Sequence, residues 1–157
     1  MLRDEASAFL NAGGRIEAGD MVLRMLRVAL PAGAGDRADG QAIALLQAVG
    51  GFQAYRRAVP APPHAGPVAR FLMFERNYPD SVAAAVDAVN AALRTADASP
   101  RNSEPILRLS RLSADLEFRR SAESDADLRQ TCQEVQRELG LVDADIAQRY
   151  FGGAVAA

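Results

Sequence analysis

Apolar residues recur every seven positions through the first 30 residues, and this spacing constrains the fold more than any other feature of the chain. Residues seven apart lie on one face of an α-helix, so residues 1–30 are predicted to form one long helix whose apolar stripe packs against other helices. Two small residues beside the stripe, Ala12 and Gly19, would let a neighbouring helix come close. The stripe consists of Leu2, Phe9, Ile16, Leu23 and Leu30.

Helical spacing of apolar residues continues along most of the chain. Pro31 is expected to end the first helix and to open a flexible loop at 31–40, and the Pro-rich stretch 59–67 is predicted to be a stiff connector. No segment shows the alternation of apolar and polar residues that is typical of a strand. Further helices are expected at 41–59, 68–75, 82–93 with Asp80 or Ser81 as its N-cap, 106–118, and 125–150 with a kink or short break at Gly140.

The prediction is therefore an all-α fold, an antiparallel helical bundle of about five or six helices. A chain of 157 residues fits a single domain of ordinary size, so residues 1–157 are expected to form one domain.

The charge balance argues against nucleic-acid binding. The chain has 18 basic and 20 acidic residues, a formal charge of −2, whereas a nucleic-acid surface needs a clustered basic excess. Aromatic residues make up only 6% of the chain, which disfavours a base-stacking platform. The sequence has no run of about eighteen apolar residues and no signal-peptide pattern at its start. We expect a cytoplasmic protein that binds neither nucleic acid nor membrane.

Residue types that metal or cofactor chemistry needs are scarce. Cys132 and His64 are the only cysteine and the only histidine, so neither a thiolate cluster nor a ferritin-like di-metal site is expected. The chain contains no lysine and no phosphate-binding loop motif, which argues against ATP binding. We expect no metal and no cofactor, an exposed His64 in a loop and an inert thiol at Cys132.

Gly13 and Gly14 lie within the first predicted helix, just before Glu17. Each glycine in a helix interior costs about 1 kcal/mol relative to alanine, so an offsetting role is expected. Three explanations are available: close packing of another backbone, a kink, or room for a ligand beside Glu17. Close packing is the preferred one.

Glu17 is the leading candidate site residue because it flanks the apolar stripe, one position after Ile16. A half-buried carboxylate there would require a cation or several hydrogen-bond donors. Asp20 and Arg24 are four residues apart and can form an ion pair, and Arg24 could share the face of Glu17. Glu17 is then either a binding or catalytic carboxylate or, the favoured interpretation, part of a structural salt bridge that fixes helix register.

The segment FLNAGGRIEAGDMVLRML resembles the signature helix of the alpha-E domain proteins, a bacterial family of unknown function. The segments AYRRAV, at 54–59, and FLMFERNYPDSVAAAVDAV, at 71–89, resemble later parts of the family pattern. Two arginines of that pattern are replaced here, by Gly14 and by Ala18. The resemblance adds Arg15 to the ligand-binding candidates Glu17, Asp20 and Arg24. The matching residues of the first helix are Phe9, Leu10, Gly13, Arg15, Ile16, Glu17, Leu23, Arg24 and Leu26.

The resemblance implies a role beside other enzymes. Family members are found next to ATP-grasp enzymes and transglutaminase-like peptidases, which implies an accessory protein-interaction domain, not itself catalytic. An ATP-grasp-type amide ligase is the first partner it suggests, in peptide synthesis or modification. The chain resembles the second of two tandem helical halves, so a homo-oligomer, most simply a homodimer, or a companion alpha-E half is expected. A ligand-binding or catalytic domain that uses Glu17, and a purely structural bundle, are the alternatives.

Overall fold

The apolar stripe of the first segment lies along the buried face of one uninterrupted helix, α1 (Arg3–Ala29). The computed structural model describes residues 3–30, 36–122 and 124–152, and Leu2 therefore lies outside the described residues. Ile16 and Leu23 are buried, whereas Phe9 and Leu30 are half-buried against the same core. The seven-residue spacing thus predicts the buried face of α1 correctly.

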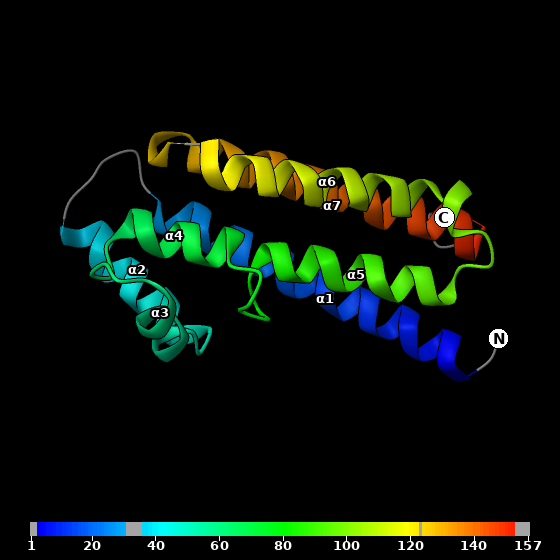
Figure 1. Ribbon diagram of the computed structural model, residues 1–157, viewed down its shortest axis with the longest axis horizontal. Helices are drawn as coiled ribbons and strands as arrows, with labels where there is room; N and C mark the ends of the chain where they lie inside the picture. Colours follow the sequence, from blue (N-terminus) through cyan, green and yellow to red (C-terminus); the bar gives the residue numbers. More distant parts are fainter. Residues whose placement is uncertain (1–2, 31–35, 123, 153–157) are drawn as a thin grey trace.

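The long helices run alternately up and down the bundle (Figure 1). α4 (Ala65–Phe74) and α5 (Val82–Ala96) follow each other back along α1, α6 (Glu104–Ala122) returns, and α7 (Leu128–Phe151) completes the bundle. α1 packs against α5 and α7, and α6 packs against the same two helices. α1 and α6 therefore lie diagonally opposite each other. The described residues contain no strand, and the predicted all-α bundle is confirmed.

Close packing in this bundle occurs at Gly19, as the sequence predicts. A Cβ added there would lie 3.4 Å from the Cβ of Ala85 on α5 and 3.6 Å from Cδ1 of Leu139 on α7. The missing side chain lets three helices meet at one level of the core.

The described residues form seven α-helices rather than five or six, mainly because the predicted helix 41–59 is two helices. These are α2 (Asp36–Ala48) and α3 (Phe52–Ala58), which lie beside α4 at one end of the bundle. α2 also begins earlier than expected, within the predicted loop 31–40, of which residues 31–35 lie outside the described residues.

The break between α2 and α3 comes from Gly50 and Gly51. Gly50 has a φ of +69°, a left-handed conformation that ends helices and favours glycine. A Cβ on Gly51 would lie 2.9 Å from the hydroxyl of Tyr78, and this hydroxyl donates to the carbonyl of Val49 at 2.9 Å. A tyrosine from a distant segment thus occupies the turn, a contact that helical spacing alone does not predict.

Other predicted boundaries are close to the observed ones. Ser81, rather than Asp80, caps α5, because its Oγ accepts a hydrogen bond from the backbone N–H of Ala84 at 3.1 Å. α7 continues through Gly140, so the expected break there does not occur. Single turns of 3-10 helix, η1 (Pro100–Asn102) and η2 (Asp125–Asp127), precede α6 and α7. None of the described helices combines the length and the apolar character that crossing a membrane requires.

Candidate functional site

Glu17 lies on the solvent side of α1, not half-buried beside the core as expected. One residue after Ile16 means a rotation of about 100° around the helix, and this rotation carries Glu17 out of the buried face. Among the described residues no hydrogen bond or ion pair involves its carboxylate. The favoured interpretation, a structural salt bridge that fixes register, is therefore wrong for Glu17.

Arg15 points away from Glu17 and holds a loop. Its guanidinium donates to the carbonyl of Pro79 at 2.8 Å and lies 3.5 Å from the carboxylate of Asp80. These residues precede α5, so Arg15 ties α1 to the start of its main neighbour. The structure thus separates Arg15 from the other candidate residues of α1.

Asp20 and Arg24 form the ion pair that their spacing predicts. The distance from Nε of Arg24 to Oδ2 of Asp20 is 2.8 Å. The other carboxylate oxygen of Asp20 accepts a hydrogen bond from Gln136 on α7 at 3.0 Å, and Gln136 in turn accepts one from Arg27 at 2.8 Å. The position of Arg24 is therefore fixed from both helices, and its terminal nitrogens remain available for other acceptors.

A surface depression of about 690 Å³ runs between α1 and α7 and brings Glu17, Asp20 and Arg24 together. Gly13 and Gly14 form part of its wall. No atom lies within 4 Å of the position that a Cβ on either glycine would take. Close packing within the chain, the preferred explanation of this pair, is therefore wrong, and α1 runs through both residues without a break.

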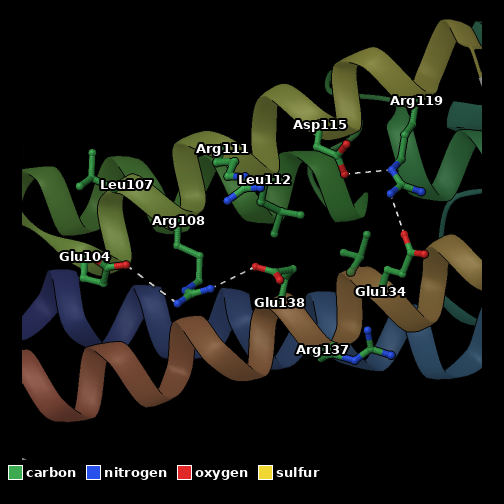
Figure 2. Close-up of a pocket in the computed structure, with 11 residues that line it drawn as sticks. Glu104, Leu107, Arg108, Arg111, Leu112, Asp115, Arg119, Glu134, Arg137 and Glu138 are labelled. Atoms are coloured by element: carbon green, nitrogen blue, oxygen red, sulfur yellow. Dashed lines mark hydrogen bonds and ion pairs between the residues drawn. The ribbon is translucent and has the colours of Figure 1, made fainter.

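A second concave surface lies between α6 and α7, has a volume of about 680 Å³ and is lined mainly by charged side chains (Figure 2). We call it the α6–α7 groove. At one end, Arg108 bridges the two helices: it lies 2.6 Å from Asp145, 3.4 Å from Glu138 and 4.0 Å from Glu104. The hydrogen bond that Arg108 donates to Asp145 raises the pKa of the guanidinium, so Arg108 stays charged in these ion pairs.

At the other end of the groove Arg119 makes the equivalent bridge. It lies 2.9 Å from Asp115 on its own helix and 2.6 Å from Glu134 on α7. It also donates to the hydroxyl of the buried Thr131 at 2.9 Å. Hydrogen bonds from Gln130 and then from Arg119 lower the pKa of Glu134, so this carboxylate stays ionised at neutral pH.

Two further arginines of the groove, Arg111 and Arg137, are exposed and form no hydrogen bond or ion pair with any described residue. Leu107 lies on the same rim and is 53% exposed. The groove therefore contains two guanidinium groups that form no ion pair with a described residue, and one exposed apolar side chain. The other two arginines of the groove are neutralised by carboxylates of the chain. Arginine and large apolar side chains are the residue types that interfaces favour.

His64 and Cys132, the only histidine and the only cysteine, make contacts within the fold. His64 is exposed and its Nδ1 lies 2.8 Å from Oδ2 of Asp39, which joins α2 to the start of α4. Cys132 is buried, with its sulfur 3.8 Å from that of Met73. In the described parts of the chain no group of three or more His, Cys, Asp or Glu side chains is arranged to hold a metal ion.

Two charged clusters were not predicted from the sequence. Asp97, whose side chain is 2% exposed, joins the end of α5 to Arg149 and Tyr150 of α7. Arg76 joins the α4–α5 loop to Asp87 on α5 and, at 3.2 Å, to Glu117 on α6. Glu75 and Arg76 form the only Glu-Arg dipeptide in the chain. No local pattern marks these residues, since their partners lie 11 to 53 positions away.

Comparison with known proteins gives one match. A family model described as a predicted alpha-helical domain with a conserved ER motif matches residues 1–151. Searches of curated proteins and of solved structures found no match.

Proposed function

Since the chain belongs to the Alpha-E family, we propose that it is an accessory protein-interaction domain, not itself catalytic. In this proposal it acts beside an ATP-grasp-type amide ligase, or beside a transglutaminase-like peptidase, in peptide synthesis or modification. The ligase is the first partner to test.

The observation that carries the proposal is an exposed stripe on α6, formed by Leu107, Arg111, Ala114 and Phe118. These residues are four, three and four positions apart, so they lie on one face of the helix. Phe118 is 70% exposed and Leu107 53% exposed. Large apolar side chains arranged along one face, next to an arginine, are typical of a surface that binds another protein.

The charges of the α6–α7 groove indicate what that partner should present. Arg108 and Arg119 are neutralised by carboxylates of the chain, whereas Arg111 and Arg137 are not paired with any described residue. A complementary surface would place carboxylates opposite these two arginines and an apolar pocket opposite Phe118. Engagement of the groove's carboxylates in ion pairs also favours a binding role over an acid–base role.

The test is co-expression of the chain with a neighbouring ATP-grasp-type ligase, followed by co-purification and by ligase activity with and without the chain. Phe118→Glu and Leu107→Glu should each abolish co-purification, because each places a charged carboxylate in the apolar contact. A carboxylate at position 107 would in addition pair with Arg111, four positions along α6, and would occupy a guanidinium that the partner needs. Phe118 and Leu107 are both exposed, so folding stability should change by about 0.5 kcal/mol or less. Gln53→Glu, at an exposed position of α3 that belongs to neither surface, is the control and should leave co-purification intact. A ligase that is indifferent to the wild-type chain would refute the proposal.

One observation favours the alternative of a ligand-binding or catalytic site in the α1–α7 depression. Glu17 is an exposed carboxylate with no partner among the described residues, beside an Asp20–Arg24 pair that Gln136 holds in place. Glu17→Gln discriminates between the two. If it abolishes the activity of the assembled system while melting temperature and self-association stay unchanged, the depression is the functional site. The accessory role requires that activity survive this substitution.

A further inference from the structure

The solvent side of α1 carries a second stripe, formed by Leu10, Gly14, Glu17, Met21, Arg24 and Val28. We call it the α1 outer stripe. Its members alternate four and three positions apart, which is the heptad spacing by which two helices pack along each other. The stripe runs for 18 residue steps, about 27 Å of helix at 1.5 Å per residue.

Apolar side chains on the α1 outer stripe are open to solvent at both ends and in the middle. Leu10 is 79% exposed, Met21 60% and Val28 74%. Leu10, Gly14, Glu17 and Arg24 also border the depression between α1 and α7, whereas the opposite face of α1 is buried against α5 and α7. Figure 1 shows the first part of α1 along the lower edge of the bundle, whereas its later part passes behind α4, with α2 and α3 below it. Three large apolar groups at heptad spacing therefore have no cover within the described chain.

From this arrangement we infer that the α1 outer stripe is a two-fold interface with a second copy of the same chain, in which the two α1 helices run antiparallel. Within it, Glu17 of each copy pairs with Arg24 of the other. The inference concerns the side of the bundle opposite α6, so it does not depend on the proposed ligase partner.

Charge complementarity decides the direction of the two helices. In a parallel pair related by a two-fold axis, each residue faces its own equivalent, so Glu17 would meet Glu17 and Arg24 would meet Arg24. Both contacts are repulsive. In an antiparallel pair the heptad positions meet in mixed layers, which places Leu10 opposite Val28 and Glu17 opposite Met21 of the other copy. The Glu17 carboxylate then lies about three residue steps, roughly 4.5 Å along the axis, from the level of the other copy's Arg24.

The same arrangement gives a role to the glycine pair. The layer that contains Arg24 places Gly14 of the other copy opposite it. Gly14 and its neighbour Gly13 have open space where a side chain would be, so the long guanidinium side chain can cross the interface there. Nε of Arg24 is held by Asp20 at 2.8 Å, which leaves its terminal nitrogens to donate to the Glu17 carboxylate of the partner.

Sedimentation equilibrium of the full chain, at concentrations from about 1 to 300 µM, measures the association. The wild type is expected to show a monomer–dimer equilibrium. Glu17→Arg and Arg24→Glu should each raise the dimer dissociation constant by about tenfold or more, because both Glu–Arg contacts become like-charge contacts. An equimolar mixture of the two variants should regain dimers, since each contact in the mixed pair again joins opposite charges. Arg129→Glu, an exposed charge reversal on α7, is the matched control and should associate like the wild type.

Direction is tested by disulfide formation. The double variant L10C/V28C should form a covalent dimer under mild oxidation, because the two introduced thiols lie opposite each other between antiparallel helices. L10C alone should not. Circular dichroism of every variant should match the wild type, so that loss of dimer cannot be attributed to unfolding. A wild type that stays monomeric to the highest concentration, a mixture of charge variants that stays monomeric, or rapid cross-linking of L10C alone would each overturn the inference.

Discussion

Replacing Asp97 by asparagine should destabilise the protein by about 2 to 3 kcal/mol at pH 7. Asp97 ends α5, and its carboxylate accepts hydrogen bonds from Arg149 at 2.7 and 3.1 Å, from the backbone N–H of Ser99 at 2.7 Å and from the hydroxyl of Tyr150. The side chain is 2% exposed, so water cannot replace these donors. The substitution removes the charge on which three elements, α5, η1 and α7, converge.

The magnitude follows from these contacts. A hydrogen bond to a charged group contributes about 1.5 to 3 kcal/mol, and removing one partner of a buried ion pair costs about 3 to 5 kcal/mol. Arg149 is 30% exposed and regains hydration, and the asparagine oxygen still accepts one hydrogen bond, so the expected loss falls below that range. For a domain of this size each kcal/mol shifts the melting temperature by about 2 to 4 °C. The expected shift is therefore roughly 4 to 12 °C.

The effect should also depend on pH. The hydrogen bonds from Arg149, and then those from Tyr150 and Ser99, hold the pKa of the Asp97 carboxyl well below its usual value. A depressed folded-state pKa gives stability that is fully present above the unfolded pKa of about 3.9 and is lost as the pH falls below it. The difference in unfolding free energy between the wild type and Asp97→Asn should therefore be constant from pH 5 to 7 and should shrink from pH 4 toward pH 2.

Thermal and urea unfolding followed by circular dichroism measure both effects. Asp80→Asn is the matched control, because Asp80 is 54% exposed and lies 3.5 Å from Arg15, the kind of surface ion pair that contributes about 0 to 1 kcal/mol. Two results would refute this reasoning. One is a melting temperature of Asp97→Asn as close to that of the wild type as the melting temperature of Asp80→Asn. The other is a loss of unfolding free energy in Asp97→Asn that is as large at pH 2.5 as at pH 6.

Two further predictions concern α1 and the core. Gly19→Val should destabilise the chain by about 1 to 3 kcal/mol, because its added carbons would meet Ala85, 3.4 Å from the new Cβ. Gly13→Ala should stabilise the chain by up to about 1 kcal/mol, because nothing lies within 4 Å of the new Cβ. Denaturant titrations measure both changes in unfolding free energy, and opposite signs would contradict the packing described. The Cys132 thiol is buried, so its reaction with a thiol reagent should follow global unfolding, and rapid modification under native conditions would show that α7 opens locally.

The sequence predicts most of the helices because each is amphipathic over several turns. The stripe that contains Ile16 and Leu23 can be predicted without knowing which helices pack against it. The Asp20–Arg24 pair also follows from local spacing. The division of 41–59 into two helices did not follow, because it depends on the left-handed φ of Gly50 and on the ring of Tyr78, which comes from a segment far along the chain.

Site residues were harder to predict than helices. Glu17 was predicted to lie at the edge of the core, but it is exposed. One position after Ile16 corresponds to about 100° around the helix axis, which takes Glu17 out of the buried face. Arg15 was grouped with it, although its partner, Pro79, is 64 positions away. Asp97 reads locally as an ordinary acid at a helix end, and only the convergence of α5 and α7 makes it a buried ion-pair partner. Contacts between distant segments are set by tertiary packing, which periodicity does not specify.

The position of α1 between α5 and α7 has a consequence for how the chain is made. Among the described helices α1 is synthesised before the others, yet the helix that completes the cover of its buried face, α7, is synthesised after all of them. The end of α7 lies 122 residues after the end of α1, and at about 5 to 20 residues per second the synthesis of this stretch takes roughly 6 to 24 seconds. During that interval the apolar face of α1 lacks its native neighbour α7, and a chaperone that binds short apolar segments would meet α1 before the other described helices.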